Sequence, residues 1–139
     1  MSIIIGLDPG NHTGVATFIN GNLTSLATIS PHQIEEVIAG ASRVIFEDSR
    51  LTSFMFTSVK SRPAALKIAR NVGEIDAWCR LIVSQCAEMR IPAHGISPQN
   101  KGAKLSATQF NKFTAWTGKS NQHERDAATV AWPYRRAAK

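Results

Sequence analysis

Residues 2–8 read SIIIGLD, an almost unbroken apolar run that ends in an acid and meets Pro9-Gly10 at once. A short, continuous apolar run bounded by a turn signal is typical of a central strand that is buried on both faces. Asp-Pro-Gly favours a tight turn, because proline presets φ and glycine tolerates positive φ. We therefore expect a buried strand that carries Asp8 at its end.

Further strands are predicted along the chain. Residues 14–19 and 23–29 are rich in β-formers and are joined by Asn20-Gly21-Asn22, in which Asn-Gly is a strong hairpin signal. Residues 43–47, RVIFE, form a fourth candidate that again ends in acid, and residues 92–97 form a fifth. The predicted fold class is α/β, with a five-stranded mixed sheet whose first three strands are antiparallel.

Helical patterns separate and follow the later strands. Ser30-Pro31 can start a short helix over residues 32–39, and residues 107–117 suggest a helix that Gly118 ends. A last helix begins near Asn121 and stops before Pro133. Residues 132–139 are expected to form a mobile tail.

The strongest periodic pattern lies between residues 63 and 90. Apolar side chains recur there at spacings of three and four, from Ala65 to Met89, which predicts one long helix with a continuous apolar stripe. The sheet or a second subunit has to cover this stripe. Trp78 and Leu81 lie off the stripe, so they either pack in the core or leave room for a dimer contact.

The chain has 139 residues, of which 43% are hydrophobic, and a net charge of +6. A chain of this size buries roughly two thirds of its unfolded surface in one core, so we expect a single domain over residues 1–139. The charge is uneven: residues 1–42 carry −3, residues 43–88 carry +2 and residues 89–139 carry +7. Such a surplus favours a polyanionic partner such as nucleic acid, although a merely soluble basic surface has the same composition.

Membrane insertion and secretion are not expected. The apolar run at residues 3–5 has no basic flank and is far shorter than a span of ~20 apolar residues. Cys79 and Cys86 fall on the predicted long helix about 10.5 Å apart, whereas a disulfide needs less than about 7 Å between Cα atoms. We expect two reduced, buried thiols and a cytoplasmic location.

Four residues with metal-binding or acid–base chemistry stand at element ends. Asp8 closes the first strand, Glu47 closes the fourth, and His123 and Asp126 lie one turn apart at the start of the last helix. If the two strands are parallel neighbours, their carboxylates face one edge of the sheet, and residues i and i+3 share a helix face. Four ligands could therefore converge.

Each of these residues also has a simpler interpretation. Asp8 before Pro-Gly can be only a turn residue, and a strand-end acid can be only a surface group. The acids near residue 124 can serve the helix N-terminus, with Asn121 as cap and Glu124 at the third helical position. Asp48 competes with Glu47, because strand alternation sends neighbouring residues to opposite sides of a sheet.

Three motifs in this order resemble a known family. Residues 4–10 (IIGLDPG) with Gly14-Val15-Ala16, then residues 44–47 (VIFE), then His123-x-x-Asp126 before an alanine-rich helix are similar to RuvC-type Holliday-junction resolvases of the ribonuclease H-like superfamily. The resemblance covers residues 2–132. The compact connection between the third and fourth strands looks like the bacteriophage branch of that family.

The resemblance implies a ribonuclease H-like fold and a metal-dependent endonuclease that cleaves four-way and related branched DNA. Asp8, Glu47, His123 and Asp126 would hold two Mg²⁺ ions per site, with Mn²⁺ as an alternative and Asp8 as the bridge. Lys104 would act near the scissile phosphate. A homodimer would supply the two symmetric cuts, in the cytoplasm of a bacterium or a phage-infected host.

Basic and aromatic residues suggest how DNA is held. The loop before the long helix mixes cations with phenylalanines, which suits gripping phosphates while a ring stacks on an unpaired base. The phenylalanines can instead form the core of an extra hairpin, and the lysines can be merely solvated. The DNA-contact candidates are Arg50, Phe54, Phe56, Lys60, Arg62, Lys67, Arg70, Lys101 and Lys104.

Two other functions stay open. A different ribonuclease H-like nuclease, acting on an RNA–DNA hybrid or on structured RNA, would use the same acids. A non-catalytic binder of branched DNA would use only the basic loops. An actin-like ATPase is excluded, since 139 residues supply no second lobe and no glycine-rich phosphate loop with a lysine is present.

Overall fold

The computed structural model describes residues 1–51, 61–100 and 102–136, and a five-stranded sheet lies at its centre. The strands are β1 (Ile3–Asp8), β2 (Thr13–Ile19), β3 (Asn22–Ile29), β4 (Arg43–Glu47) and β5 (Ala93–Ile96). They are ordered β3-β2-β1-β4-β5, with antiparallel pairing among the first three and parallel pairing of β1 with β4 and of β4 with β5. The predicted mixed sheet is confirmed.

The central position of β1 explains why its sequence is apolar without alternation. Leu7 packs with Val44 and Phe46 on one face of the sheet, whereas Ile4 packs with Ile45 on the other. Ile4 and Leu7 are both completely buried. A strand between two apolar layers needs apolar side chains at odd and even positions alike.

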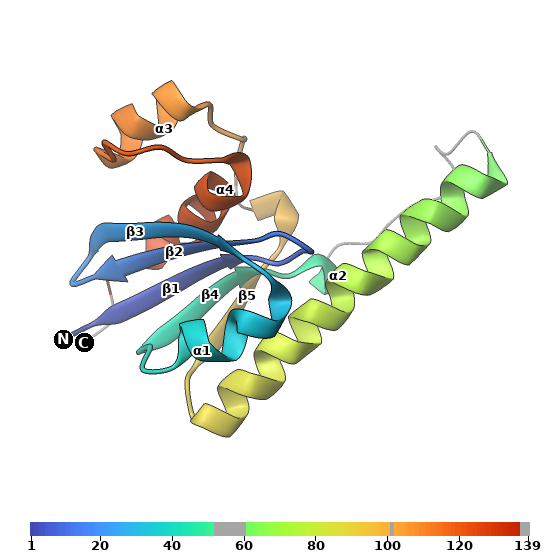
Figure 1. The fold of residues 1–139 in the computed structure, drawn as a ribbon, viewed down its shortest axis with the longest axis horizontal. Coiled ribbons are helices and arrows are strands. Elements are labelled where there is room, and N and C mark those ends of the chain that lie inside the picture. The colour runs from blue at the N-terminus through green and yellow to red at the C-terminus, as the bar shows by residue number, and fades with distance from the viewer. Residues whose placement is uncertain (52–60, 101, 137–139) are drawn as a thin grey trace.

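Helices cover both faces of the sheet, as Figure 1 shows. On one face lie α1 (Ile34–Ile38), which follows a 3-10 turn at Pro31–Gln33, and the long α2 (Arg62–Met89). On the other face lie α4 (Gln122–Ala131) and, outside it, α3 (Ala107–Thr114). Among the described helices, none has the combined length and apolar character needed to cross a bilayer.

The long helix is packed along only part of its length. Cys79, Ile82 and Cys86 of its second half are buried against the sheet, and both thiols are free. The first turns extend beyond the sheet edge at which β1 and β4 end (Figure 1). In this part of the stripe, Ala65, Ile68 and Val72 are half-buried and lie outside the core cluster, which includes Ile75. The predicted stripe is thus covered by the sheet only from about Ile75 onward.

The end of α3 differs from the prediction. The helix stops at Thr114, whose hydroxyl bonds the carbonyl of Phe110, and Ala115 takes the left-handed cap with φ of 63°. Gly118 has another role: a Cβ there would lie 3.2 Å from the indole nitrogen of Trp116, which folds back over it. The helix therefore ends before residue 117, and Gly118 makes room for an aromatic ring.

The segment after α4 begins as an ordered turn. Trp132–Tyr134 form a 3-10 helix, and the Trp132 ring packs against Phe18 and Phe113 with centroids 6.0 and 5.1 Å away. Arg135 stacks its guanidinium 4.0 Å above the Trp132 ring. The tail predicted to be mobile from residue 132 therefore starts with packed aromatic groups, and residues 137–139 lie outside the described residues.

Candidate active site

The parallel pairing of β1 and β4 brings two carboxylates to one edge of the sheet. Gly6 is paired with Ile45 and Leu7 with Phe46, so the next residues on the two strands are Asp8 and Glu47. Gly6 and Ile45 face α4, and alternation along each strand turns Asp8 and Glu47 to this same face. The strand-end convergence inferred from the sequence is present.

Helix α4 lies unusually close to the sheet because two glycines admit it. A Cβ on Gly6 would collide with the carbonyl oxygen of Ala127 and lie 2.7 Å from the Cβ of Ala131. A Cβ on Gly14 would collide with the carbonyl oxygen of His123. The missing side chains let the first turn of α4 rest over the end of β1.

The start of α4 is held by a capping box. The Asn121 side chain accepts from the Glu124 amide at 2.9 Å, and the Glu124 side chain accepts from the Asn121 amide at 3.0 Å. Glu124 also accepts from the hydroxyl of Thr28 on β3 at 3.0 Å. Glu124 therefore has the capping role that the sequence allowed, and it anchors the helix to the sheet.

The first turn of α4 presents His123 and Asp126 to the strand-end carboxylates. His123 Nδ1 lies 3.5 Å from Asp8 Oδ2. Lys104 Nζ lies 3.6 Å from Asp126 Oδ2, and this carboxylate is 7% exposed while the lysine side chain is 66% exposed. The lysine, supplied by the loop before α3, thus places a positive charge beside a buried acid.

All five predicted catalytic residues line one open cavity of about 370 Å³. The lining side chains with metal-binding or proton-transfer chemistry are Asp8, His12, Glu47, Lys104, His123 and Asp126. Carboxylate oxygens with one imidazole form a donor set that suits Mg²⁺ or Mn²⁺. Within the described residues, however, no three His, Cys, Asp or Glu side chains are gathered closely enough to hold an ion in their present positions.

Asp48 lies on the other face of the sheet from Glu47. Its carboxylate receives two bonds from the Arg50 guanidinium, at 2.9 and 2.8 Å, and packs against Gly95. These hydrogen bonds hold the pKa of Asp48 below its ordinary value of 3.8. Of the two neighbouring acids, Glu47 is therefore the one in the cavity, and Arg50, a predicted DNA contact, is bound to Asp48.

The remaining DNA-contact candidates that the structure describes lie in two places. Arg62, Lys67 and Arg70 are exposed on the first turns of α2, and Lys104 is in the cavity. Phe54, Phe56, Lys60 and Lys101 lie outside the described residues. The cations of α2 extend the positive surface away from the carboxylates.

Sequence reasoning missed two positioning residues on α4. The Gln122 amide donates to Asp126 Oδ1 at 2.8 Å and orients that carboxylate. Arg125 donates to the carbonyl of Leu105 at 2.9 Å, which ties the loop bearing Lys104 to the helix. The i to i+4 spacing of Gln122 and Asp126 was a usable signal, whereas the partner of Arg125 is 20 residues away in the chain.

The sheet order, its mixed pairing and the strand-end acids define a ribonuclease H-like fold. The structure is similar to that of RuvC from Thermus thermophilus in complex with a Holliday junction substrate, with a TM-score of 0.63 and 15% identity over 95% of this chain and 91% of that one. A second Thermus thermophilus RuvC structure gives a TM-score of 0.62 and 13% identity, over 94% and 91%. The RuvC-like fold is therefore confirmed.

No protein-family model matches the sequence, and no curated protein matches it. At identities of 13–15% the likeness to RuvC establishes the fold alone. The activity has to be argued from the residues of this chain.

Proposed function

We propose that the protein is a divalent-metal-dependent endonuclease that cleaves phosphodiesters in Holliday junctions and related branched DNA. The observation that carries this proposal is the single cavity that combines Asp8, Glu47, His123 and Asp126 with Lys104 at the carboxyl ends of parallel strands. Its setting in a RuvC-like fold supports the same substrate, since one of the similar structures contains a Holliday junction.

The carboxylates and the imidazole are the groups that would hold two Mg²⁺ or Mn²⁺ ions. When bound, such ions stabilise negative charge on the phosphate and lower the pKa of a coordinated water. Asp8, which lies 3.5 Å from His123, and Asp126, which lies 3.6 Å from Lys104, would be ligands of such ions. Lys104 would bind a phosphate oxygen, and Gln122 would keep Asp126 oriented toward the cavity.

The DNA arms would run along the first turns of α2. Arg62, Lys67 and Arg70 are exposed on α2, whose first turns extend beyond the strand ends (Figure 1). Cations on this helix would neutralise backbone phosphates without reading bases, which fits recognition of a branched shape. A homodimer would present two such cavities to the two strands that a junction requires to be cut.

The test uses labelled four-way junction, Y-fork, linear duplex and RNA–DNA hybrid, each with Mg²⁺ and with chelator. We expect Mg²⁺-dependent cutting of the branched substrates. Asp8→Asn should abolish it, with a loss of at least about 10³-fold, while DNA binding is kept because the lost charge repels phosphate. Glu35→Gln, which removes an exposed carboxylate of α1, is the matched control and should cut normally.

The competing functions predict different results. A preference for the hybrid over the junction would select another ribonuclease H-like nuclease. Tight junction binding with no cutting in any metal would select a non-catalytic binder. Cutting that persists in chelator, or in Asp8→Asn, would reject the metal-dependent assignment of this cavity.

A further inference from the structure

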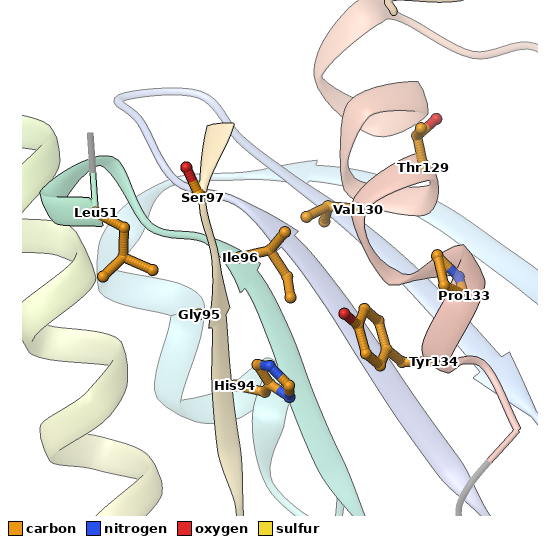
Figure 2. Close-up of a pocket in the computed structure, with 9 residues that line it drawn as sticks. All are labelled: Leu51, His94, Gly95, Ile96, Ser97, Thr129, Val130, Pro133 and Tyr134. Atoms are coloured by element: carbon orange, nitrogen blue, oxygen red, sulfur yellow. The ribbon is translucent and has the colours of Figure 1, made fainter. Parts of the chain in front are cut away.

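A second pocket, which we call the His94–Tyr134 pocket, lies beside the carboxylate cavity. It has a volume of about 270 Å³ and lies between β5 and the chain that runs from the end of α4 into the 3-10 helix Trp132–Tyr134. Figure 2 shows the residues that line it. Sites for drug-sized ligands are usually about 300–1,000 Å³, so this pocket fits one small group. The catalytic residues named above take no part in its lining.

The two pockets are joined through shared elements. Ile96, in the floor of the His94–Tyr134 pocket, is paired across the sheet with Glu47 of the carboxylate cavity. Val130 lies one helical turn after Asp126, and residues four apart on a helix have Cβ atoms roughly 5–6 Å apart. A ligand that has its phosphate at the carboxylates can therefore reach this pocket with the adjoining group.

The chemistry of the pocket changes along its length. Ser97 and Thr129 lie at one end of the pocket, whereas the rings of His94 and Tyr134 approach each other at the other end (Figure 2). The Thr129 hydroxyl donates to the carbonyl of Arg125 at 2.7 Å and can still accept a hydrogen bond. The ring centroids are 5.0 Å apart, with planes inclined by 50°. Ile96 and Val130 are 8% and 2% exposed and form an apolar floor.

The polar atoms of the two rings are available to a ligand. Among the described residues, neither the His94 imidazole nor the Tyr134 hydroxyl has a hydrogen-bond partner, although each side chain lines the pocket. An imidazole and a phenol each both donate and accept. Their rings add flat surfaces on which another ring can stack.

We infer that the His94–Tyr134 pocket accepts one unpaired nucleobase from the strand whose phosphate lies at the carboxylates. The hydroxyl end would meet the sugar, and the aromatic end would stack and hydrogen-bond the base. The inference rests on the proposed function and deepens it. A base leaves the stack at least cost where it is mismatched or already unpaired, so the pocket favours branched DNA over intact duplex.

The test is a double-mutant cycle that combines the removal of a pocket side chain with the removal of one base from the DNA. In an Asp8→Asn background, the affinity for a four-way junction is measured with an abasic site placed in turn at each position flanking the branch. With the pocket intact, we expect one position at which losing the base weakens binding about tenfold, the size of a lost stacking contact. In His94→Ala, the intact junction should bind correspondingly weaker, and the abasic site should then make no further difference.

Control substitutions distinguish a loss of base binding in the pocket from a general loss of folding or DNA affinity. His32→Ala removes an exposed imidazole elsewhere on the molecule and should keep the full abasic effect. Tyr134→Phe keeps the ring and should retain most of the effect. Since His94 is exposed on the edge strand, its alanine variant should fold normally, which circular dichroism checks.

The outcomes distinguish the pocket from the proposed function. If wild-type protein cuts junctions but His94→Ala shows the same abasic penalty at every position, the pocket inference is overturned and the function stands. If the base-specific coupling appears without any metal-dependent cutting, the pocket stands and the function fails. If no abasic position matters, the pocket inference is overturned whatever the cutting result.

Discussion

The Asp48–Arg50 pair is the residue-scale feature with the clearest pH consequence. The bonds from Arg50 keep Asp48 ionised below its ordinary pKa of 3.8, so the pair stabilises the fold above that value and its contribution is lost as pH falls through the lowered pKa. Asp48→Asn should lower the free energy of unfolding by roughly 1–3 kcal/mol at pH 7, the scale of hydrogen bonds to charged groups. Urea unfolding at pH 7 and pH 2.5 should show this difference shrinking in acid; an equal difference at both would contradict it.

The two thiols give a second residue-scale prediction. Burial raises the pKa of Cys79, and raises that of Cys86 to about 11, so both stay protonated and shielded at neutral pH. Thiolate is the reactive form, and we expect the folded protein to react with a thiol reagent at pH 8 far more slowly than the protein in urea. Rapid labelling of both thiols in the native state would show that the second half of α2 opens readily.

For single residues, the sequence predicted positions on the strands better than contacts between side chains. The strand-end rule predicted that Asp8 and Glu47 would lie at the same end of the sheet, and they do, because alternation and parallel pairing are local consequences of backbone geometry. It did not predict that Arg50 would bind Asp48, since the turn after β4 that brings them together is set by packing against α2. The contact of Lys104 with Asp126 likewise depends on a loop path that no local pattern encodes.

The close packing of α4 on the sheet can be tested by adding one methyl group at Gly6. Gly6→Ala places a Cβ against Ala127 and Ala131 with no flexible group to move, so we expect a loss of about 1–3 kcal/mol in unfolding free energy. Activity should fall too, because α4 carries His123 and Asp126. Gly73→Ala is the control: its Cβ meets nothing within 4 Å on α2, and it should stabilise the helix by about 0.5–1 kcal/mol. Urea unfolding of both variants should show a lower free energy of unfolding for Gly6→Ala and a higher one for Gly73→Ala.

Element positions followed from the sequence wherever local signals agreed. The five strands and the long helix lie where apolar pattern, turns and caps predicted them. The end of α3 did not, because the fold of Trp116 over Gly118 is decided by side-chain packing rather than by the preference of glycine for helix ends. The sequence also did not predict that Gly6 and Gly14 allow α4 to pack closely on the sheet, because Gly6 is only one residue of an apolar run there.

The molecule as a whole separates its acidic chemistry from its basic surface. Residues 1–42 carry −3 and supply the central strand with Asp8, whereas residues 89–139 carry +7 and supply Lys104. Under the proposed function, a polyanion would be drawn to the outer cations and would meet the carboxylates only at the cavity, where ions would offset their repulsion. Net charge favours a polyanionic partner, but only the topology indicates where on the molecule the carboxylates and the cations meet.

The first half of α2 carries an apolar surface that a second copy of the protein could cover. On the turns that extend past the sheet, Ile68 and Val72 of the apolar stripe are half-buried and lie outside the core cluster, so this part of the stripe has no full cover within the described residues. We expect a homodimer that uses this face, because two paired cuts need two cavities and a second copy would bury the stripe. Ile68→Asp should shift the protein toward monomer in sedimentation and turn paired cuts of a cruciform into single nicks. Val83→Asp, which alters an exposed position on the packed half of the same helix, should change neither. A wild-type monomer at working concentration that still makes paired cuts would contradict the prediction.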